Sequence, residues 1–301
     1  MTVPFLKCFF LGLIAITLFS STVLSESDQP ANVPPWHQGS QGESSTASES
    51  SQAAPSSQDH FLKSFWRDEC QLWTSPARGG TYRSHTVKKY GLPFLLLSAA
   101  SIGTDRKTGD LLPNTQDQTR WSGRVSQLGA SYTLAGISGA TLLLGKLKES
   151  SHLEETGRLG LQAIAHTQVV VFAIKQITNR ERPLVHDGHG SFWKGGNSFP
   201  SGHAATSFAV ATVFAYEYRD QHAVPIASYA LASLVAASRL SAQRHWVSDI
   251  FVGGSLGFLI GRYVYKTHHD PNLPGSPVGR SSRLVPQVGF GGRQFFLAWQ
   301  F

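Results

Sequence analysis

Six apolar stretches, separated by polar or Gly/Pro-containing turns, constrain the fold of this chain more than any other feature. They run approximately over 92–103, 126–147, 157–178, 203–218, 223–239 and 246–265. Each stretch mixes small and large apolar residues, as helices do where they pack against other helices. No strand-like alternation interrupts them. The sequence therefore predicts an all-α domain, a helical bundle of about six core helices.

A shorter amphipathic segment precedes these stretches. Its apolar residues fall on one helical face: Phe61, Leu62, Phe65, Trp66, Leu72 and Trp73. Such a helix either caps a core, which is the more common arrangement, or lies in a membrane interface.

The ends of the chain have different compositions from the centre. Lys7 precedes an apolar run that is too short for a comfortable membrane span, and small residues follow it, so 1–25 is predicted to be an export signal peptide. Residues 26–60 are rich in Ser, Gln, Pro and Glu and are predicted to be a disordered linker. Once the signal is removed, Cys70 is the one remaining cysteine, which excludes an internal disulfide.

The predicted domain extends over 61–270, and a Pro/Gly-rich tail follows over 271–301. The last part of that tail places glycines between two apolar runs, a pattern that a short β-hairpin can adopt. His268 and His269 close the helical domain. An adjacent pair at a helix end is more often a solvated turn than a metal ligand, so no metal site is predicted there.

Spanning a bilayer takes roughly 20 mostly apolar residues. Among the uncharged windows of the bundle, only the one between Arg124 and Lys146 is long enough, and it contains several polar residues. This pattern favours a soluble or peripheral bundle and leaves short, tilted spans around a polar site open. The expected location is outside the cytoplasm, either periplasmic or membrane-associated.

The charge balance favours an anionic partner. The formal net charge is +7 and the isoelectric point is near 9.5. The basic residues are scattered and form no block of like charges, which argues against nucleic-acid binding. A phosphate-binding pocket is the better interpretation. No feature of the sequence indicates an oligomeric state.

Two cations mark the end of the third apolar stretch. Lys175 and Arg182 are seven residues apart, so on a continuing helix both would point from the same face before Pro183 stops it. Taken alone, such a pair is more often a pair of surface cations near a helix C-terminus. The strongly apolar run before Lys175 argues against a freely exposed helix end.

The run Pro200-Ser201-Gly202-His203 precedes the next apolar stretch. Ser201 is placed as an N-cap, with Gly202 and His203 opening the helix. Free backbone N–H groups at a helix start bind anions, and a glycine there lets a phosphate approach the backbone. His203 would lie in the same anion site as a proton donor, although a structural role in the capping turn is an equal alternative.

A second histidine has a carboxylate partner. His245 and Asp249 are four residues apart, so on a helix the carboxylate can reach the imidazole. That bond would fix the ring tautomer and leave the other nitrogen free as a nucleophile. Arg239 is expected at the end of the previous helix. The His/Asp pair alone is more often structural than catalytic.

Together these residues resemble a known family. The pattern consists of Lys175, six residues and Arg182-Pro183; then Pro200-Ser201-Gly202-His203; then Ser238-Arg239, five residues, His245, three residues and Asp249. It is similar to the three-part signature of the type 2 phosphatidic acid phosphatase superfamily, which includes bacterial nonspecific acid phosphatases and vanadium haloperoxidases. The resemblance covers 61–268, and each motif matches without a departure.

The resemblance implies a role for each residue. His245 would attack phosphorus and become a phosphohistidine, Asp249 would orient it, and His203 would protonate the leaving oxygen and later activate water. The phosphate oxygens would be neutralised by Lys175, Arg182, Arg239, Ser201 and the Gly202 backbone. No metal and no other cofactor is required in this scheme.

The implied function is hydrolysis of a phosphomonoester or diphosphate, carried by a phosphorylated lipid or a small phosphate ester. Residues that recognise the rest of the substrate are expected in loops over 104–124 and 184–196. Two alternatives remain: a haloperoxidase in which the same pocket holds vanadate, and a phospholipid-binding protein without turnover.

Overall fold

The computed structural model describes residues 57–74, 87–112, 115–183, 189–276, 287–291 and 294–298. The predicted signal peptide 1–25 and most of the predicted linker lie outside these residues. The chain divides into two compact units, 1–92 and 93–301, and each is considered by itself.

The first unit contains the helix α2, Ser57–Thr74, and a short π-helix, η2, at Val87–Gly91. Helix α2 confirms the predicted amphipathic segment, although it begins before residue 61. Its last turn is closed by the Thr74 hydroxyl, which donates a hydrogen bond to the Cys70 carbonyl at 2.5 Å.

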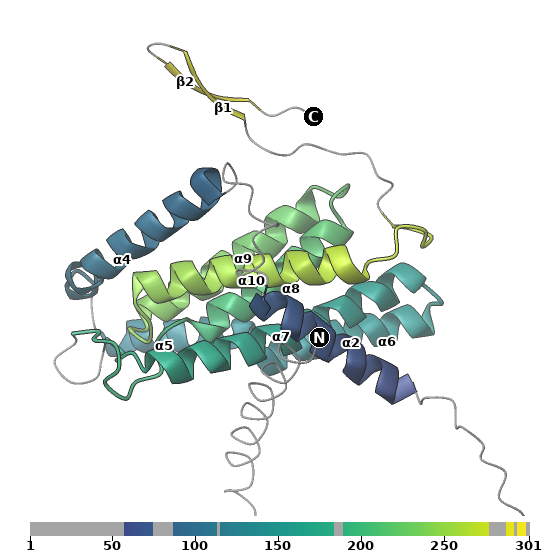
Figure 1. Ribbon diagram of the computed structural model, residues 1–301, viewed down its shortest axis with the longest axis horizontal. Helices are drawn as coiled ribbons and strands as arrows, with labels where there is room; N and C mark the ends of the chain where they lie inside the picture. Colours follow the sequence, from purple (N-terminus) through teal and green to yellow (C-terminus); the bar gives the residue numbers. More distant parts are fainter. Residues whose placement is uncertain are drawn as a thin grey trace, which may run out of the picture. The chain divides into compact units, whose positions relative to one another are not determined.

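The second unit is a helical bundle (Figure 1). Its helices are α4 Leu92–Asp110, α5 Gln116–Ser126, the 3-10 turn η3 Gln127–Gly129, α6 Ser131–Leu147, α7 Ser151–Thr178, α8 Gly202–Glu217, α9 Ala223–Ser241 and α10 Val247–His268. The predicted all-α class is confirmed.

The expected loop over 104–124 is wrong, because α4 continues through its first part and α5 occupies its second part. Helix α5 has a local start signal at Thr115, whose hydroxyl accepts a hydrogen bond from the Gln118 amide at 3.3 Å. The polar composition of this segment reflects helices with polar faces, not irregular backbone.

Helix α8 is the centre of the bundle and packs against α7, α9 and α10. Its contact with α10 is the closest, since glycines repeat every four residues along α10. A Cβ added at Gly253 would lie 2.6 Å from the Ser201 carbonyl oxygen. At Gly257 and Gly261 the corresponding distances, to the carbonyl oxygens of Ala205 and Ala209, would be 2.0 and 2.3 Å. Both series advance in the same direction, so α8 and α10 are parallel and both N-termini lie at one end of the bundle.

The C-terminus of α7 reaches the same end. The Thr178 hydroxyl donates a hydrogen bond to the Phe199 carbonyl, just before α8, at 3.0 Å. The end of α7 and the beginnings of α8 and α10 therefore meet, which brings the sequence motifs together.

Large apolar side chains face outward on several helices. Those on α4, α6 and α9 that are at least half exposed include Leu95, Leu96, Leu97, Tyr132, Leu143, Leu147, Ile226, Leu231 and Leu234. Within the residues that the structure describes, three segments are long and apolar enough to cross a membrane: Gln116–Leu147, Ala223–Ser241 and Val247–His268. The sequence windows without any charge identified only one segment of sufficient length. Charged side chains near helix ends are compatible with a membrane span, so further segments qualify. These outward apolar faces indicate association with a membrane.

The predicted hairpin in the tail is present. Strand β1, Gln287–Gly291, pairs antiparallel with β2, Gln294–Ala298, and places Val288 opposite Leu297.

The expectation of a solvated turn after α10 is wrong for His269. Its side chain is 10% exposed, and its Nδ1 lies 3.2 Å from Glu155 Oε2 and 3.3 Å from Glu217 Oε1. The end of α10 packs where α7 begins and α8 ends, which removes this imidazole from water.

The α8–α10 contact can be tested by adding one methyl group. Gly257→Ala should lower the free energy of unfolding by about 1–3 kcal/mol, since the new Cβ would overlap the Ala205 carbonyl. Gly136→Ala on α6 is the control, because open space surrounds that glycine and alanine should stabilise the helix by roughly 0.5–1 kcal/mol. Equal unfolding midpoints for the two variants would contradict the close packing.

Candidate active site

Lys175 and Arg182 converge as predicted, but not on one continuing helix. Helix α7 ends at Thr178, and Asn179 follows in the left-handed conformation with φ 41°, so the helix stops well before Pro183. Both cations reach Asn197 instead: Lys175 Nζ donates to its backbone carbonyl, and Arg182 Nε donates to Oδ1 at 2.9 Å.

Asn197 is held by a close backbone approach. The Gly196 amide donates to the Asn179 carbonyl at 3.1 Å, and the Ser198 amide donates to the Arg180 carbonyl at 2.9 Å. A Cβ at Gly196 would lie 2.0 Å from that Arg180 carbonyl oxygen, so only glycine fits here. The glycine-rich run before α8 thus forms backbone hydrogen bonds with the segment after α7, and Asn197 contacts both Lys175 and Arg182.

Ser201 occupies the predicted N-cap position of α8, with extended backbone angles. Its hydroxyl makes no capping bond, which differs from the expected N-cap geometry. Instead the side chain is fully buried, and Oγ has no hydrogen-bond partner among the described residues. The Ser201 amide donates to the Asp249 carbonyl at 3.0 Å, which joins the starts of α8 and α10.

Arg239 lies in the last turn of α9, as predicted. One nitrogen, Nη1, donates to Ser126 Oγ at 2.9 Å. The Nε atom is buried and, within the described part of the chain, has no acceptor. Buried polar atoms normally have partners, so the unpaired Ser201 hydroxyl and Arg239 Nε–H are groups that an anion could satisfy.

His245 precedes α10 and is not on the helix, so the expected i, i+4 helical pairing is wrong in detail. Its Nδ1 lies 2.8 Å from the Ser198 carbonyl oxygen and 3.5 Å from Asp249 Oδ2. A carbonyl can only accept, so Nδ1 carries the proton and Nε2 keeps its lone pair. Asp249 lies in the first turn of α10, where Oδ2 accepts from the Trp246 amide at 2.9 Å.

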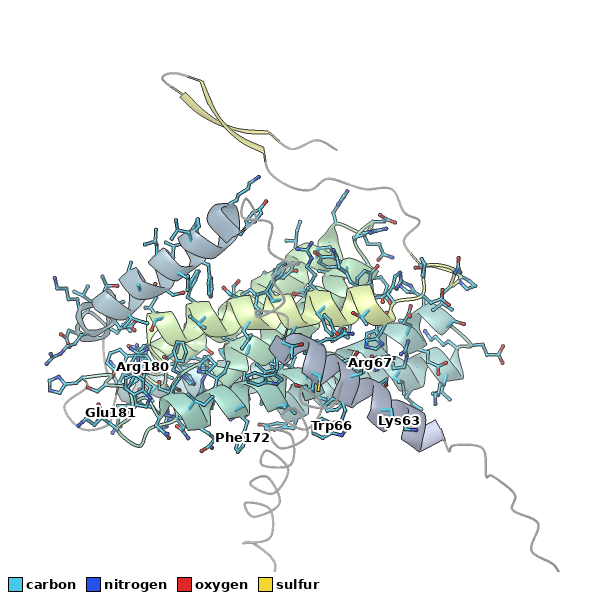
Figure 2. The ribbon with its side chains drawn as sticks, in the orientation of Figure 1. Lys63, Trp66, Arg67, Phe172, Arg180 and Glu181 are labelled. Carbon is cyan, nitrogen blue, oxygen red and sulfur yellow. The ribbon has the colours of Figure 1, made fainter. Side chains whose placement is uncertain are left out.

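Sequence reasoning missed Arg180, which lies beside Glu181 at one end of the bundle (Figure 2) and is buried. Its Nη2 donates to Asp105 Oδ2 and its Nη1 to Asp249 Oδ1, both at 2.7 Å. Its Nε donates to the Gly190 carbonyl at 3.0 Å. The guanidinium thus links three parts of the fold: α4, α10 and the segment that follows α7.

The same guanidinium is enclosed by aromatic rings. Its carbon lies 4.7 Å from the centroid of Phe192 and 5.6 Å from that of Trp246, distances at which a cation is attracted to the ring face. Ser248 completes the cluster, since its hydroxyl contacts both Arg180 and Asp105. No spacing in the sequence marks Asp105, Ser198 or Ser248 as members of this site.

The cations depress one another's affinity for protons. Burial, followed by the charges of Arg182 and Arg239, lowers the pKa of Lys175 to about 8. Burial and the charge of Arg239 lower the pKa of His203 to about 4. Burial also lowers the pKa of His245 to about 4, against the opposing effect of Asp249. At neutral pH the site therefore holds a neutral His245 in a strongly positive environment.

Comparison with known proteins supports the interpretation of the three sequence motifs. Residues 159–272 match the family model of the PAP2 superfamily. This segment contains every residue of the three motifs, from Lys175 to Asp249. The resemblance predicted from the motifs is therefore confirmed over this part of the chain.

The chain is also similar to the lipid A 1-phosphatase of Porphyromonas gingivalis, with 44% identity over 70 residues. That match covers 23% of this chain and only 16% of the relative. Among solved structures, a PAP2-type phosphatidylglycerolphosphate phosphatase of Bacillus subtilis matches with 25% identity and a TM-score of 0.43, over 58% of this chain and 92% of that one. LpxE of Aquifex aeolicus matches with 21% identity and a TM-score of 0.42, over 55% and 93%.

The Arg180 cluster predicts a large stability effect. Arg180→Met should lower the free energy of unfolding by about 3–5 kcal/mol, since two buried carboxylates would lose their shared cation. Arg106→Met is the matched control, because Arg106 is exposed on the same turn of α4 as Asp105, and its unfolding midpoint should stay close to wild type. A similar midpoint for Arg180→Met would show that Asp105 and Asp249 do not depend on this cation.

Proposed function

We propose that this chain is a metal-independent phosphatase that hydrolyses a phosphorylated lipid, releasing phosphate from a phosphomonoester or diphosphate through a phosphohistidine at His245. The observation that carries the proposal is the pair of buried, unpaired donors, Ser201 Oγ and Arg239 Nε, beside two neutral histidines. A phosphate group would accept from both donors and would be neutralised by the surrounding cations.

In the first step, the lone pair of His245 Nε2 attacks phosphorus, a P–N bond forms and the P–O bond to the leaving group breaks. The Ser198 carbonyl holds the Nδ1–H during this change, and the nearby Asp249 stabilises the positive charge that develops on the ring. His203 gives its proton to the leaving oxygen. In the second step His203 takes a proton from water, the hydroxide attacks phosphorus, the P–N bond breaks and inorganic phosphate leaves.

His203 needs the substrate in order to act as an acid. Its pKa of about 4 would leave it without a proton at neutral pH. The cations that depress this pKa are the ones that a bound phosphate would neutralise. Phosphate binding should therefore raise the pKa of His203 and supply the acid only when a substrate is present.

Two observations favour a lipid over a small soluble ester. The outward faces of α4, α6 and α9 carry large exposed apolar side chains, and three of the described segments are long and apolar enough to cross a membrane. The curated relative is a lipid A 1-phosphatase. We infer a membrane-associated enzyme whose phosphate site lies outside the cytoplasm, in agreement with the predicted export signal.

His245→Asn should abolish phosphate release from an aryl phosphate and from lipid phosphates, because it removes the nitrogen that forms the P–N bond in the proposed mechanism. His222→Asn is the matched control, since His222 is an exposed residue before α9, and its turnover should equal wild type. His203→Asn should accumulate a base-stable, acid-labile phosphoenzyme with an aryl phosphate, whose leaving group needs no proton.

The same measurements separate the alternatives. Retained turnover in His245→Asn would exclude the proposed nucleophile. Lipid-phosphate binding by wild type without phosphate release would favour a binding protein. Bromide oxidation that appears only with added vanadate, without phosphatase turnover, would favour a haloperoxidase.

Lys175 should set the alkaline limit of activity. Its pKa of about 8 means that the ammonium loses its proton as the pH rises through that value, so phosphate binding weakens and kcat/KM falls. Lys175→Arg should move this limb upward by one pH unit or more, since guanidinium stays protonated. The pH dependence of kcat/KM for an aryl phosphate measures the shift, and an unmoved limb would contradict the assignment.

A further inference from the structure

A second cluster of ionisable side chains lies at the other end of the bundle. It consists of Glu155 near the start of α7, Glu217 at the end of α8 and His269 just after α10, and we call it the Glu/His cluster. Since His203 and Glu217 occupy opposite ends of α8, the cluster is about 21 Å from the phosphate site along that helix. The proposed phosphatase mechanism uses none of its members.

Both carboxylates of this cluster are buried. Glu155 is 3% exposed and Glu217 is 1% exposed. Arg158 forms an ion pair with Glu155 at 3.4 Å, and its side chain is about half exposed to solvent. Two buried negative charges with so little compensation are costly.

The hydrogen bonds leave one oxygen without a donor. Glu217 Oε2 lies 2.9 Å from His152 Nε2, and Glu155 Oε1 accepts from the Asp270 amide at 2.9 Å. Glu217 Oε1 is buried and accepts no hydrogen bond from any described residue, although it lies 3.3 Å from His269 Nδ1.

No tautomer of His269 satisfies the whole cluster. If Nδ1 carries a proton, that proton can serve Glu155 Oε2 at 3.2 Å but not Glu217 Oε1 as well. If Nε2 carries the proton and donates to Ser276 Oγ at 3.0 Å, a lone pair on Nδ1 faces both carboxylates. The second arrangement is completed by a cation located among the three side chains, which would take the Nδ1 lone pair and the unpaired oxygen of Glu217.

We propose that the Glu/His cluster is a structural zinc site that joins the ends of α7, α8 and α10, with Glu155, Glu217 and His269 as ligands. The ligand atoms of the three residues all lie within 4.8 Å of one another. The distances from His269 Nδ1 to the two carboxylates, 3.2 and 3.3 Å, equal the spacing of about 3.3 Å between ligand atoms in a tetrahedron with bonds of roughly 2.0–2.1 Å. Solvent would supply the fourth ligand.

The surrounding residues already orient these ligands. Ser276 can hold His269 with Nδ1 toward the carboxylates, His152 holds Glu217 through Oε2, and the Asp270 amide holds Glu155 through Oε1. Outer partners of this kind fix tautomer and orientation at zinc sites. An imidazole nitrogen among the ligands favours zinc over magnesium or calcium, which prefer all-oxygen sites.

The test uses the full chain in detergent, stripped with EDTA, dialysed and then given ZnCl2. We expect one zinc per chain by elemental analysis and a thermal unfolding midpoint several degrees higher than that of the stripped protein. Glu217→Gln and His269→Asn should each weaken zinc binding more than about tenfold and remove the zinc-dependent shift. The matched controls Glu154→Gln and His268→Asn change the neighbouring residues of the same types and should bind zinc as wild type does.

Zinc-independent midpoints in wild type, or equal zinc binding by Glu217→Gln and Glu154→Gln, would overturn the proposal. Binding of CaCl2 or MgCl2 in place of ZnCl2 would overturn the choice of metal. If the stripped Glu217→Gln variant is more stable than stripped wild type and zinc affects neither, a proton on Glu217 neutralises the cluster instead. Turnover of an aryl phosphate, measured in parallel, tests the proposed function separately, because none of these residues contacts the phosphate site.

Discussion

The geometry of the phosphate site depends on the buried ion pairs that the guanidinium of Arg180 forms with two carboxylates. Arg180 pairs with Asp105 on α4 and with Asp249 at the start of α10, while its own backbone carbonyl accepts from the Ser198 amide. Ser198 in turn presents the carbonyl that holds His245. A displacement of Arg180 would therefore move the proposed nucleophile, although Arg180 is not one of the proposed phosphate ligands. Such a buried network is stable only because nearly every charge in it is paired.

The scaffold also resists the repulsion among the clustered cations. Burial, followed by the charges of Arg182 and Arg239, lowers the pKa of Lys175, so these cations repel one another before an anion binds. Asn197 holds two of them through backbone and side-chain oxygens, and Ser126 holds the third. Fixing the cations in advance means that little reorganisation is needed when phosphate enters, which is the condition for strong electrostatic stabilisation.

Local sequence patterns predicted the helices and the position of Ser201 at the start of a helix. Apolar periodicity and capping preferences depend on residues only a few positions apart, so the sequence alone reveals them. They failed where a long-range contact decides the outcome. Asp105 and Arg180 are 75 residues apart, and neither has a distinguishing spacing. Helix α7 ends before Asn179 and not at Pro183. The nearest hydrogen-bond partner of His245 Nδ1 is the Ser198 carbonyl, whereas Asp249 was expected. His269 looked like a solvated residue since the sequence could not show which helix ends would surround it.

The parallel arrangement of α8 and α10 gives the bundle an electrical polarity. Peptide dipoles in each helix sum to about half a positive charge at the N-terminus and half a negative charge at the C-terminus. With the glycine contacts holding the two helices side by side, both positive ends face the phosphate site and both negative ends face the Glu/His cluster. The backbone alone thus favours an anion at one end and a cation at the other, so the same packing prepares two sites of opposite charge.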